Sequence, residues 1–251
     1  MSATPEKALI LYSHFPHNPQ WATPAIHDLC HRGCSGQLAL EGLEGQDIER
    51  TRLGELVQLL GVYGCATTAE MKQTLLERFG AMKLGILSAC PKIVSWAEEL
   101  GLVCVHIEET KNYGSQIEQI LPRVDCLFVD VSGSTEEETW TWIDSVVQPY
   151  IDTQNILKCV VSPAERVSSK TEWWNELVPR QSCVMKDGKQ VDIKKSSMVC
   201  AYFCHGSTRR DDVKQYGVQE IQADGCNGTI LAWHFLGEIG HKLGYVPKYG
   251  A

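Results

Sequence analysis

Short apolar runs alternate with stretches of helical periodicity along most of the chain. Runs of four to eight apolar residues are typical of strands that a parallel sheet buries on both faces. The pattern predicts strands at residues 8–12, 84–87, 102–107, 126–131, 156–161 and 199–203. Between them, residues 24–34, 91–100, 114–121 and 135–150 carry apolar side chains three and four positions apart and are predicted as helices. Alternation of this kind implies right-handed crossovers and a mostly parallel sheet of six or seven strands with helices on both faces.

The remaining segments have weaker patterns. Residues 36–45 are expected to form a glycine-punctuated connection, and residues 48–79 are mostly helical, with a break at Gly61 to Gly64 and a new start at Thr67 or Thr68. Residues 56–63 fit a helix or a strand. A short helix is expected at 173–177, and residues 183–185 and 197–203 flank a turn at 186–188, which indicates an antiparallel hairpin at the sheet edge. Residues 229–243 are predicted as one helix.

The whole chain, residues 1–251, is interpreted as a single α/β domain. Residues 1–50 would extend the sheet or cap it, 51–205 would form the core, and 206–251 would form a C-terminal helical segment. No apolar run approaches the roughly 18 residues that a membrane span needs. The first residues lack the apolar region and cleavage site of a signal peptide. We therefore expect a cytoplasmic protein without a membrane partner.

Composition and charge narrow the function only slightly. With 43% hydrophobic and 22% charged residues, the chain is typical of a folded globular protein. Eleven cysteines are an odd number dispersed over strands and helices, which favours reduced thiols over a disulfide framework. A net charge of -8 argues against general nucleic-acid binding, although the mildly basic stretch from Lys158 to Lys214 would allow an anionic ligand to bind locally.

The order of elements over residues 59–203 resembles that of class I S-adenosylmethionine-dependent methyltransferases, and more loosely the ribose 2′-O-methyltransferases among them. Residues 59–68 would be the first strand and cofactor loop, 124–133 the fourth strand with Asp130 at its carboxyl end, and 156–163 the fifth. The resemblance implies that S-adenosylmethionine lies over Gly61, Gly64 and Thr67. It also implies a cofactor contact with Glu108 or Glu109, and Asp130 and Lys158 facing the methyl acceptor. The acceptor is unidentified; RNA ribose or a protein would fit.

The chain also departs from that family. Leu60 takes the place of an acidic residue, and the glycines of the loop have a different spacing. Asp130 and Lys158 match only the middle pair of the Lys-Asp-Lys-Glu tetrad of the ribose methyltransferases. The structural alternatives are a helix-capping role for Asp130 and a buried, paired role for Lys158. A second hypothesis is therefore an inactive scaffold that binds a protein partner through a tryptophan-rich surface containing Trp140, Trp142, Trp173 and Trp174.

Other chemistries receive less support from the sequence. His27, Cys30, His31 and Cys34, together with Cys200, Cys204 and His205, have spacings that would suit zinc, but chance pairing of dispersed thiols is the favoured explanation. Residues 7–14 are similar to the first strand of flavodoxin-like quinone reductases, with residues 14–20 in place of the phosphate loop. Pro16 and Pro19 cannot donate hydrogen bonds there, so a flavin-binding oxidoreductase is a further, weaker alternative. A serine or cysteine hydrolase at Ser132, Ser134 or Cys204 is favoured least.

Overall fold

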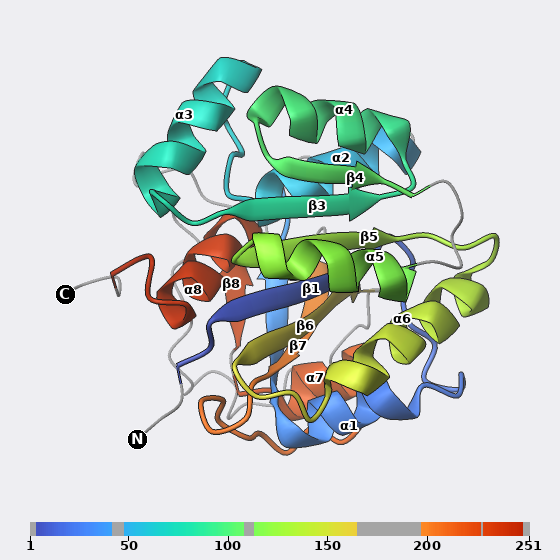
Figure 1. Ribbon diagram of the computed structural model, residues 1–251. Coiled ribbons are helices and arrows are strands. Elements are labelled where there is room, and N and C mark those ends of the chain that lie inside the picture. Colours follow the sequence, from blue (N-terminus) through green and yellow to red (C-terminus); the bar gives the residue numbers. More distant parts are fainter. Residues whose placement is uncertain (1–3, 42–47, 108–112, 165–196, 227, 248–251) are drawn as a thin grey trace.

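A single mixed sheet runs through the computed structural model of the chain (Figure 1). The structure describes all residues except 1–3, 42–47, 108–112, 165–196, 227 and 248–251. The strands are β1 (Lys7–Ser13), β2 (Cys34–Ala39), β3 (Leu84–Ser88), β4 (Val103–His106), β5 (Cys126–Val131), β6 (Ile156–Pro163), β7 (Ser197–Phe203) and β8 (Thr229–Leu231). They follow the order β4-β3-β5-β1-β6-β7-β2-β8. The expected α/β class with a mostly parallel sheet is confirmed.

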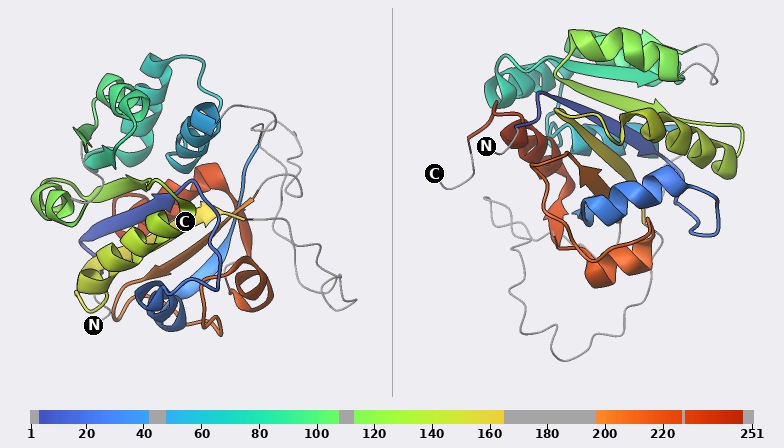
Figure 2. Two further views of the ribbon diagram at one scale, coloured as in Figure 1. Left: turned by 90° about the vertical axis from the view of Figure 1, so that its right-hand side faces the viewer. Right: turned by 60° about the horizontal axis from the view of Figure 1, so that its bottom comes forward.

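Strand direction defines the two ends of the sheet. β4, β3, β5, β1 and β6 are mutually parallel, whereas β7 is antiparallel to both of its neighbours, β6 and β2. The left panel of Figure 2 views the sheet from the end toward which the β3 and β4 arrows of Figure 1 point. The carboxyl ends of the parallel strands, where open α/β sheets bind ligands, therefore face the viewer in that panel.

Helices cover both faces. They are α1 (Pro24–Arg32), α2 (Ile48–Leu59), α3 (Thr68–Phe79), α4 (Pro91–Leu100), α5 (Tyr113–Ile120), α6 (Glu136–Tyr150), α7 (Val218–Asp224) and α8 (Phe235–Lys242), with 3-10 turns η2 (Leu121–Arg123) and η4 (Ala232–His234). One core, which we call the α2 face, contains buried side chains from α2, α3, α4 and α8, and the other, the α6 face, contains side chains from α1, α5, α6 and α7. α5 and α6 lie in front of the sheet in Figure 1, and α2 lies behind it.

The helix boundaries follow local capping chemistry. The Thr67 hydroxyl accepts a hydrogen bond from the Glu70 backbone N–H, and Thr135 does the same for Glu138, so both threonines cap the first turn of a helix. Three glutamates in the first turn of α6 interact favourably with the helix dipole. α4 starts with Pro91 and ends at Gly101, which has the left-handed φ of 76°.

Three local predictions are wrong. Residues 59–68 form no strand and cofactor loop, because α2 continues to Leu59 and is followed by turns at Gly61 and Gly64 with φ of 72° and 87°. Residues 34–39 form β2, although the helix was expected to reach residue 34 and a connection to begin at residue 36. Residues 229–243 divide into β8, η4 and α8 rather than one helix. β7 is antiparallel as expected but lies between β6 and β2, while the expected partner strand at 183–185 and the helix at 173–177 lie outside the described residues.

The junction of α1 with β2 leads to the first testable prediction. A Cβ atom at Gly33 would lie 2.7 Å from the Leu29 carbonyl oxygen and closer still to that of Tyr202, and both are backbone atoms with little freedom to move. We expect Gly33→Ala to lower the free energy of unfolding by about 1–3 kcal/mol, measured by urea denaturation.

A matched control is available on α5. A Cβ atom at Gly114 would meet no atom within 4 Å, and the residue is helical. Gly114→Ala should therefore raise the free energy of unfolding by about 0.5–1 kcal/mol. Equal stabilities for the two alanine variants would contradict the close packing assigned to Gly33.

Candidate functional site

A buried ion pair lies at the carboxyl ends of β5 and β3. Asp130, the next-to-last residue of β5, is fully buried, and it accepts a hydrogen bond from the Ser88 hydroxyl at the end of β3. From α2, the Arg52 Nε atom donates to Oδ1 of Asp130 at 2.7 Å, and Nη2 lies 2.6 Å from Oδ2. Both carboxylate oxygens therefore contact the guanidinium, and one also binds a hydroxyl group.

A second polar group lies next to this pair at the end of β1. The Tyr12 hydroxyl, which is fully buried, donates to Oε2 of Glu55. The same oxygen lies 3.4 Å from Nδ1 of His14, the residue that follows β1. The His14 side chain is 16% exposed, so this imidazole lies where the network meets solvent. We call these six residues the carboxyl-end network: Tyr12, His14, Arg52, Glu55, Ser88 and Asp130.

Burial dominates the electrostatics of the network. Desolvation raises the pKa of Asp130, while the neighbouring Arg52 and the Ser88 hydroxyl act in the opposite direction. Burial alone would lower the pKa of Arg52, but the Asp130 carboxylate reverses this and raises it. Burial, with Glu55 and Asp130 nearby, raises the pKa of Tyr12 far above its ordinary value. Tyr12 is thus a neutral donor and Arg52 a permanent cation.

The geometry of α2 supplies two members of the network. Arg52 and Glu55 are three residues apart, and Leu56 and Leu59 continue the same helical stripe into the core. Two ionisable residues on an otherwise apolar stripe are unusual, because their burial is costly without partners. That placement is the sequence signal that could have identified Arg52 and Glu55, whereas apolar spacing alone does not mark them.

Of the residues expected at the acceptor site, Asp130 lies in the network and Lys158 does not. In β6, Lys158 is level with Leu9 of β1, whereas Asp130 is level with Tyr12, three residues further along. Side chains alternate between the faces of a strand, so Asp130 belongs to the α2 face and Lys158 to the α6 face. The predicted approach of these two residues is therefore wrong.

Lys158 is instead buried against a backbone carbonyl and an aromatic ring. Its side chain is 1% exposed, Nζ donates to the Thr153 carbonyl at 2.7 Å, and it lies over the Phe203 ring at 5.3 Å. Arg32 lies against the same ring, with its guanidinium carbon 4.6 Å from the centroid. Burial, opposed by Cys204 and reinforced by Arg32, lowers the pKa of Lys158 to about 8.

The expected cofactor residues are not assembled. Gly61 and Gly64 form turns after α2, and Thr67 caps α3. A Cβ atom at Gly61 would collide with the Arg78 guanidinium and lie 2.8 Å from the Trp233 carbonyl oxygen, so this glycine is needed for packing against the chain itself. Glu108 and Glu109 lie outside the described residues.

The cysteines considered as zinc ligands lie in a different arrangement from the one expected. Cys34 begins β2 instead of continuing α1, and Cys30 and Cys200 are buried, which raises the pKa of both thiols. Within the described chain, the only three-residue group with metal-binding geometry is Cys34, Asp211 and Cys226, which combines one of the expected cysteines with two other residues.

The loop after β1, expected in place of a flavin phosphate loop, has its interior filled by side chains, with His17 of the loop packed against residues from other parts of the chain. His17 is buried, its ring centroid lies 4.6 Å from that of Trp140 and 5.4 Å from that of Tyr216, and Nε2 contacts the Thr23 hydroxyl at 3.0 Å. Burial, together with His27, lowers the pKa of His17 to about 4, so the ring is neutral.

The tryptophan-rich surface expected to bind a partner is described only in part. Trp140 is fully buried and Trp142 is half-buried, while Trp173 and Trp174 lie outside the described residues. The partner-binding surface therefore stays a prediction.

Comparison with known proteins identifies the fold. No protein-family model and no curated protein matches the sequence. Among solved structures, protein PH0037 from Pyrococcus horikoshii has a TM-score of 0.59 and 11% identity, over 99% of this chain and 100% of that one. The cofactor-independent phosphoglycerate mutase from Thermoplasma acidophilum has a TM-score of 0.56 and 9% identity, over 95% and 99%. The lipoteichoic acid synthase LtaP from Listeria monocytogenes has a TM-score of 0.52 and 9% identity, over 99% and 74%.

These similarities overturn the methyltransferase hypothesis. The chain shares its fold with a phosphoglycerate mutase and a lipoteichoic acid synthase, and the segment expected to hold S-adenosylmethionine contains a helix and turns. Methyl transfer, S-adenosylmethionine and the inactive methyltransferase scaffold are therefore abandoned, as is the flavin-binding alternative. Among the described helices, none is both long and apolar enough to cross a membrane.

A metal centre was tested against the donors of the carboxyl-end network. Asp130 has both oxygens in contact with Arg52, so a guanidinium already lies where a metal ion would neutralise the charge. Oε2 of the second carboxylate, Glu55, accepts from Tyr12, and the metal-binding group among the described residues contains no member of the network. The described residues of the network therefore do not fit a resident metal ion.

The buried amine gives the second testable prediction. The folded pKa of Lys158, about 8, lies below its ordinary value of 10.5, so the folded state binds fewer protons than the unfolded state between these two pH values. The contribution of Lys158 to stability therefore increases as pH rises through that window, by up to about 3 kcal/mol. Lys158→Met should remove this increase, as measured by urea denaturation at the two ends of the window. The exposed Lys72 provides the control Lys72→Met, which should keep the increase; identical pH profiles for all three proteins would contradict it.

Proposed function

We propose that the protein acts on phosphate esters, as a phosphoesterase or a phosphotransferase, at the carboxyl-end network. Two kinds of observation support this. The fold is similar to that of a phosphoglycerate mutase over nearly the full length of both chains. The network also lies beyond the carboxyl ends of adjacent parallel strands, the usual position of ligand sites in open α/β sheets.

The observation that carries the proposal is a buried guanidinium whose ion pair with Asp130 leaves N–H donors unaligned with an acceptor. Nη2 of Arg52 lies 2.6 Å from Oδ2 of Asp130 as an ion pair, but its N–H groups are not aligned in a hydrogen bond with an acceptor among the described residues. The Arg52 side chain is 12% exposed. Guanidinium groups bind phosphate oxygens through paired N–H donors, and a buried donor without an acceptor costs about 1–3 kcal/mol. A phosphoryl oxygen at this position would supply the acceptor.

His14 provides the proton-transfer chemistry. Its Nδ1 lies 3.4 Å from Oε2 of Glu55, which favours the tautomer with the proton on Nδ1 and leaves the Nε2 lone pair free to accept a proton. In the proposed hydrolysis, water attacks phosphorus and the bond from phosphorus to the leaving oxygen breaks. Nε2 of His14 accepts a proton from the attacking water and delivers it to the leaving oxygen. In the transferase form, a hydroxyl group takes the place of the water.

A second candidate function follows from the same site. Asp130 and Ser88 are fully buried and satisfy each other, so they have no capacity to react with a ligand. With Glu55 included, the network also contains two carboxylates and one permanent cation. A non-catalytic protein in which this network only secures α2 on the sheet is therefore the alternative.

The third testable prediction compares two histidine variants. Nitrophenyl phosphate monoesters and diesters are the assay substrates, with and without added divalent cations, and nitrophenyl sulfate tests specificity for phosphorus. His14→Gln should lower kcat/KM by about 100-fold or more, because a general acid typically contributes at least that factor.

His205→Gln is the matched control, since His205 is exposed and lies after β7, outside the network. It should keep full activity, and both variants should unfold at the temperature of the wild type to within a few degrees. If the wild type hydrolyses no phosphate ester and inorganic phosphate causes no thermal shift, the non-catalytic alternative is correct.

A further inference from the structure

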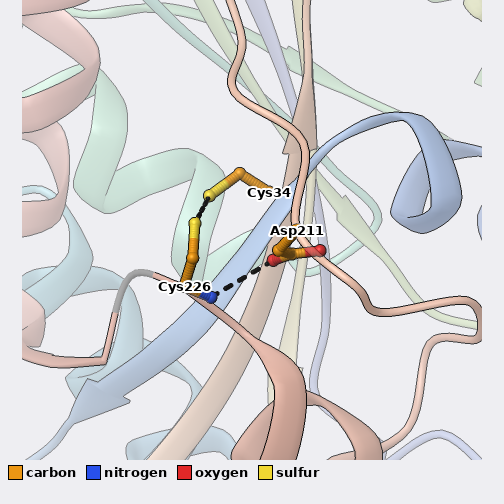
Figure 3. A group of neighbouring side chains, drawn as sticks. All are labelled: Cys34, Asp211 and Cys226. Atoms are coloured by element: carbon orange, nitrogen blue, oxygen red, sulfur yellow. Dashed lines mark hydrogen bonds between the residues drawn. The ribbon is translucent and has the colours of Figure 1, made fainter.

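Two cysteines from distant parts of the chain lie in contact at the far end of the sheet from β4. Cys34 begins β2, and Cys226 follows α7; their sulfur atoms are 2.7 Å apart (Figure 3). This distance is well inside ordinary hydrogen-bonding contact for sulfur and approaches the 2.05 Å of a disulfide bond. Cys34 is 1% exposed, whereas Cys226 is exposed, so one thiol is accessible and its partner is protected.

Asp211 holds the two cysteine segments together. Its Oδ2 accepts backbone hydrogen bonds from Ser35, the neighbour of Cys34, at 2.6 Å and from Cys226 itself at 3.4 Å. Oδ1 accepts the Val213 N–H at 3.2 Å. A buried carboxylate that binds both backbones fixes the separation of the two sulfurs without reacting with either, so Asp211 is a positioning residue. Figure 3 shows its carboxylate directed at the Cys226 backbone nitrogen.

We propose that Cys34 and Cys226 form a reversible redox pair, oxidised to an intramolecular disulfide by low-molecular-weight disulfides such as glutathione disulfide. The pair is independent of the proposed function. β2 is separated from β1 by β6 and β7, which places Cys34 about 14 Å from the nearest strand of the carboxyl-end network. The disulfide would join the start of β2 to the segment that precedes β8, its other neighbour in the sheet.

The exchange balances with glutathione disulfide as the oxidant. The Cys226 thiolate attacks one sulfur of glutathione disulfide, forming a mixed disulfide and releasing one glutathione. The Cys34 thiolate then attacks Sγ of Cys226 and displaces the second glutathione. Two protein thiols are oxidised, one glutathione disulfide is reduced to two glutathione molecules, and the two thiol protons end on them. Exposure makes Cys226 the first to react.

The second step is expected to be slow at neutral pH. Burial, and then the neighbouring Cys226, raise the pKa of Cys34 to about 12, and the thiolate is the reactive form. The rate of disulfide formation should therefore increase several-fold for each pH unit on the alkaline side.

A zinc site is the competing interpretation of the same three residues. Zinc would require the Asp211 carboxylate as a ligand, but both of its oxygens already accept backbone hydrogen bonds. Zinc would also separate the sulfurs, because two thiolates at about 2.3 Å from one ion lie well over 3 Å apart. The observed contact is closer to the covalent geometry.

The fourth testable prediction is that treating the full chain with glutathione disulfide removes two of its eleven thiols. Alkylation under denaturing conditions followed by mass spectrometry should identify a peptide that joins Cys34 to Cys226. Because the bond would close a loop between residues 192 positions apart, the oxidised protein should unfold at least about 4 °C above the reduced one, reversibly on adding dithiothreitol.

Cys226→Ser should abolish both the cross-link and the thermal shift, and its exposed position allows the substitution without loss of folding. Cys104→Ser, at a half-buried thiol elsewhere, is the control and should keep both effects. Cys34→Ser, if it folds, should stop at the mixed disulfide on Cys226. Full retention of the thiols, a cross-link between other cysteines, or one equivalent of zinc that is lost in Cys226→Ser would each overturn the proposal.

Discussion

The position of α2 depends on the ion pair between Arg52 and Asp130. Asp130 is the next-to-last residue of the central strand β5, and its side chain is fully buried. A carboxylate in that environment stays charged only if a cation and hydrogen-bond donors contact it. Arg52 supplies the cation and Ser88 a hydroxyl group, so one interaction joins α2, β3 and β5. Breaking a buried pair by removing one partner typically costs several kcal/mol, because the remaining charge has no compensation. The network is therefore both a structural junction and the most polar part of the sheet's ligand-binding end.

Strand alternation decides which ionisable residues can act together. Asp130 and Lys158 both lie in parallel strands of one sheet, and the sequence places each in an otherwise apolar run. Their register differs by three residues, an odd number, so the two side chains belong to opposite faces whatever the rotamers. Each residue is therefore stabilised in the protein interior by different partners. Asp130 pairs with a guanidinium, while Lys158 has a lowered pKa, a carbonyl acceptor and an aromatic ring.

The central parallel strands β1, β3, β5 and β6 could be predicted from the sequence because each is largely buried on both faces and consists mainly of apolar residues. The edge strand β4 is half-exposed, but its valines still gave a recognisable apolar run. β2 could not, because Cys34 to Ala39 contains serine, glycine and glutamine and becomes a strand only through long-range pairing with β7 and β8. Within the site, Asp130 was accessible to sequence reasoning as an acid at a strand end. Arg52 and Glu55 were not identified from apolar spacing, since their importance lies in being charged on a stripe that the sheet buries.

Similar folds leave the chemistry open, because function depends on the residues that a chain places at the shared crevice. Here the loop after β1 offers few backbone amides for binding a phosphate. It contains Pro16 and Pro19, and its interior is filled by neutral His17 packed on Trp140. Recognition of an anion at this end of the sheet is therefore expected to rely on side chains, and Arg52 is a buried cation there with an N–H group that is not aligned with an acceptor. The Asp130 carboxylate already neutralises the positive charge of Arg52. Such a site would therefore bind a phosphate ester through directed hydrogen bonds more than through net positive potential.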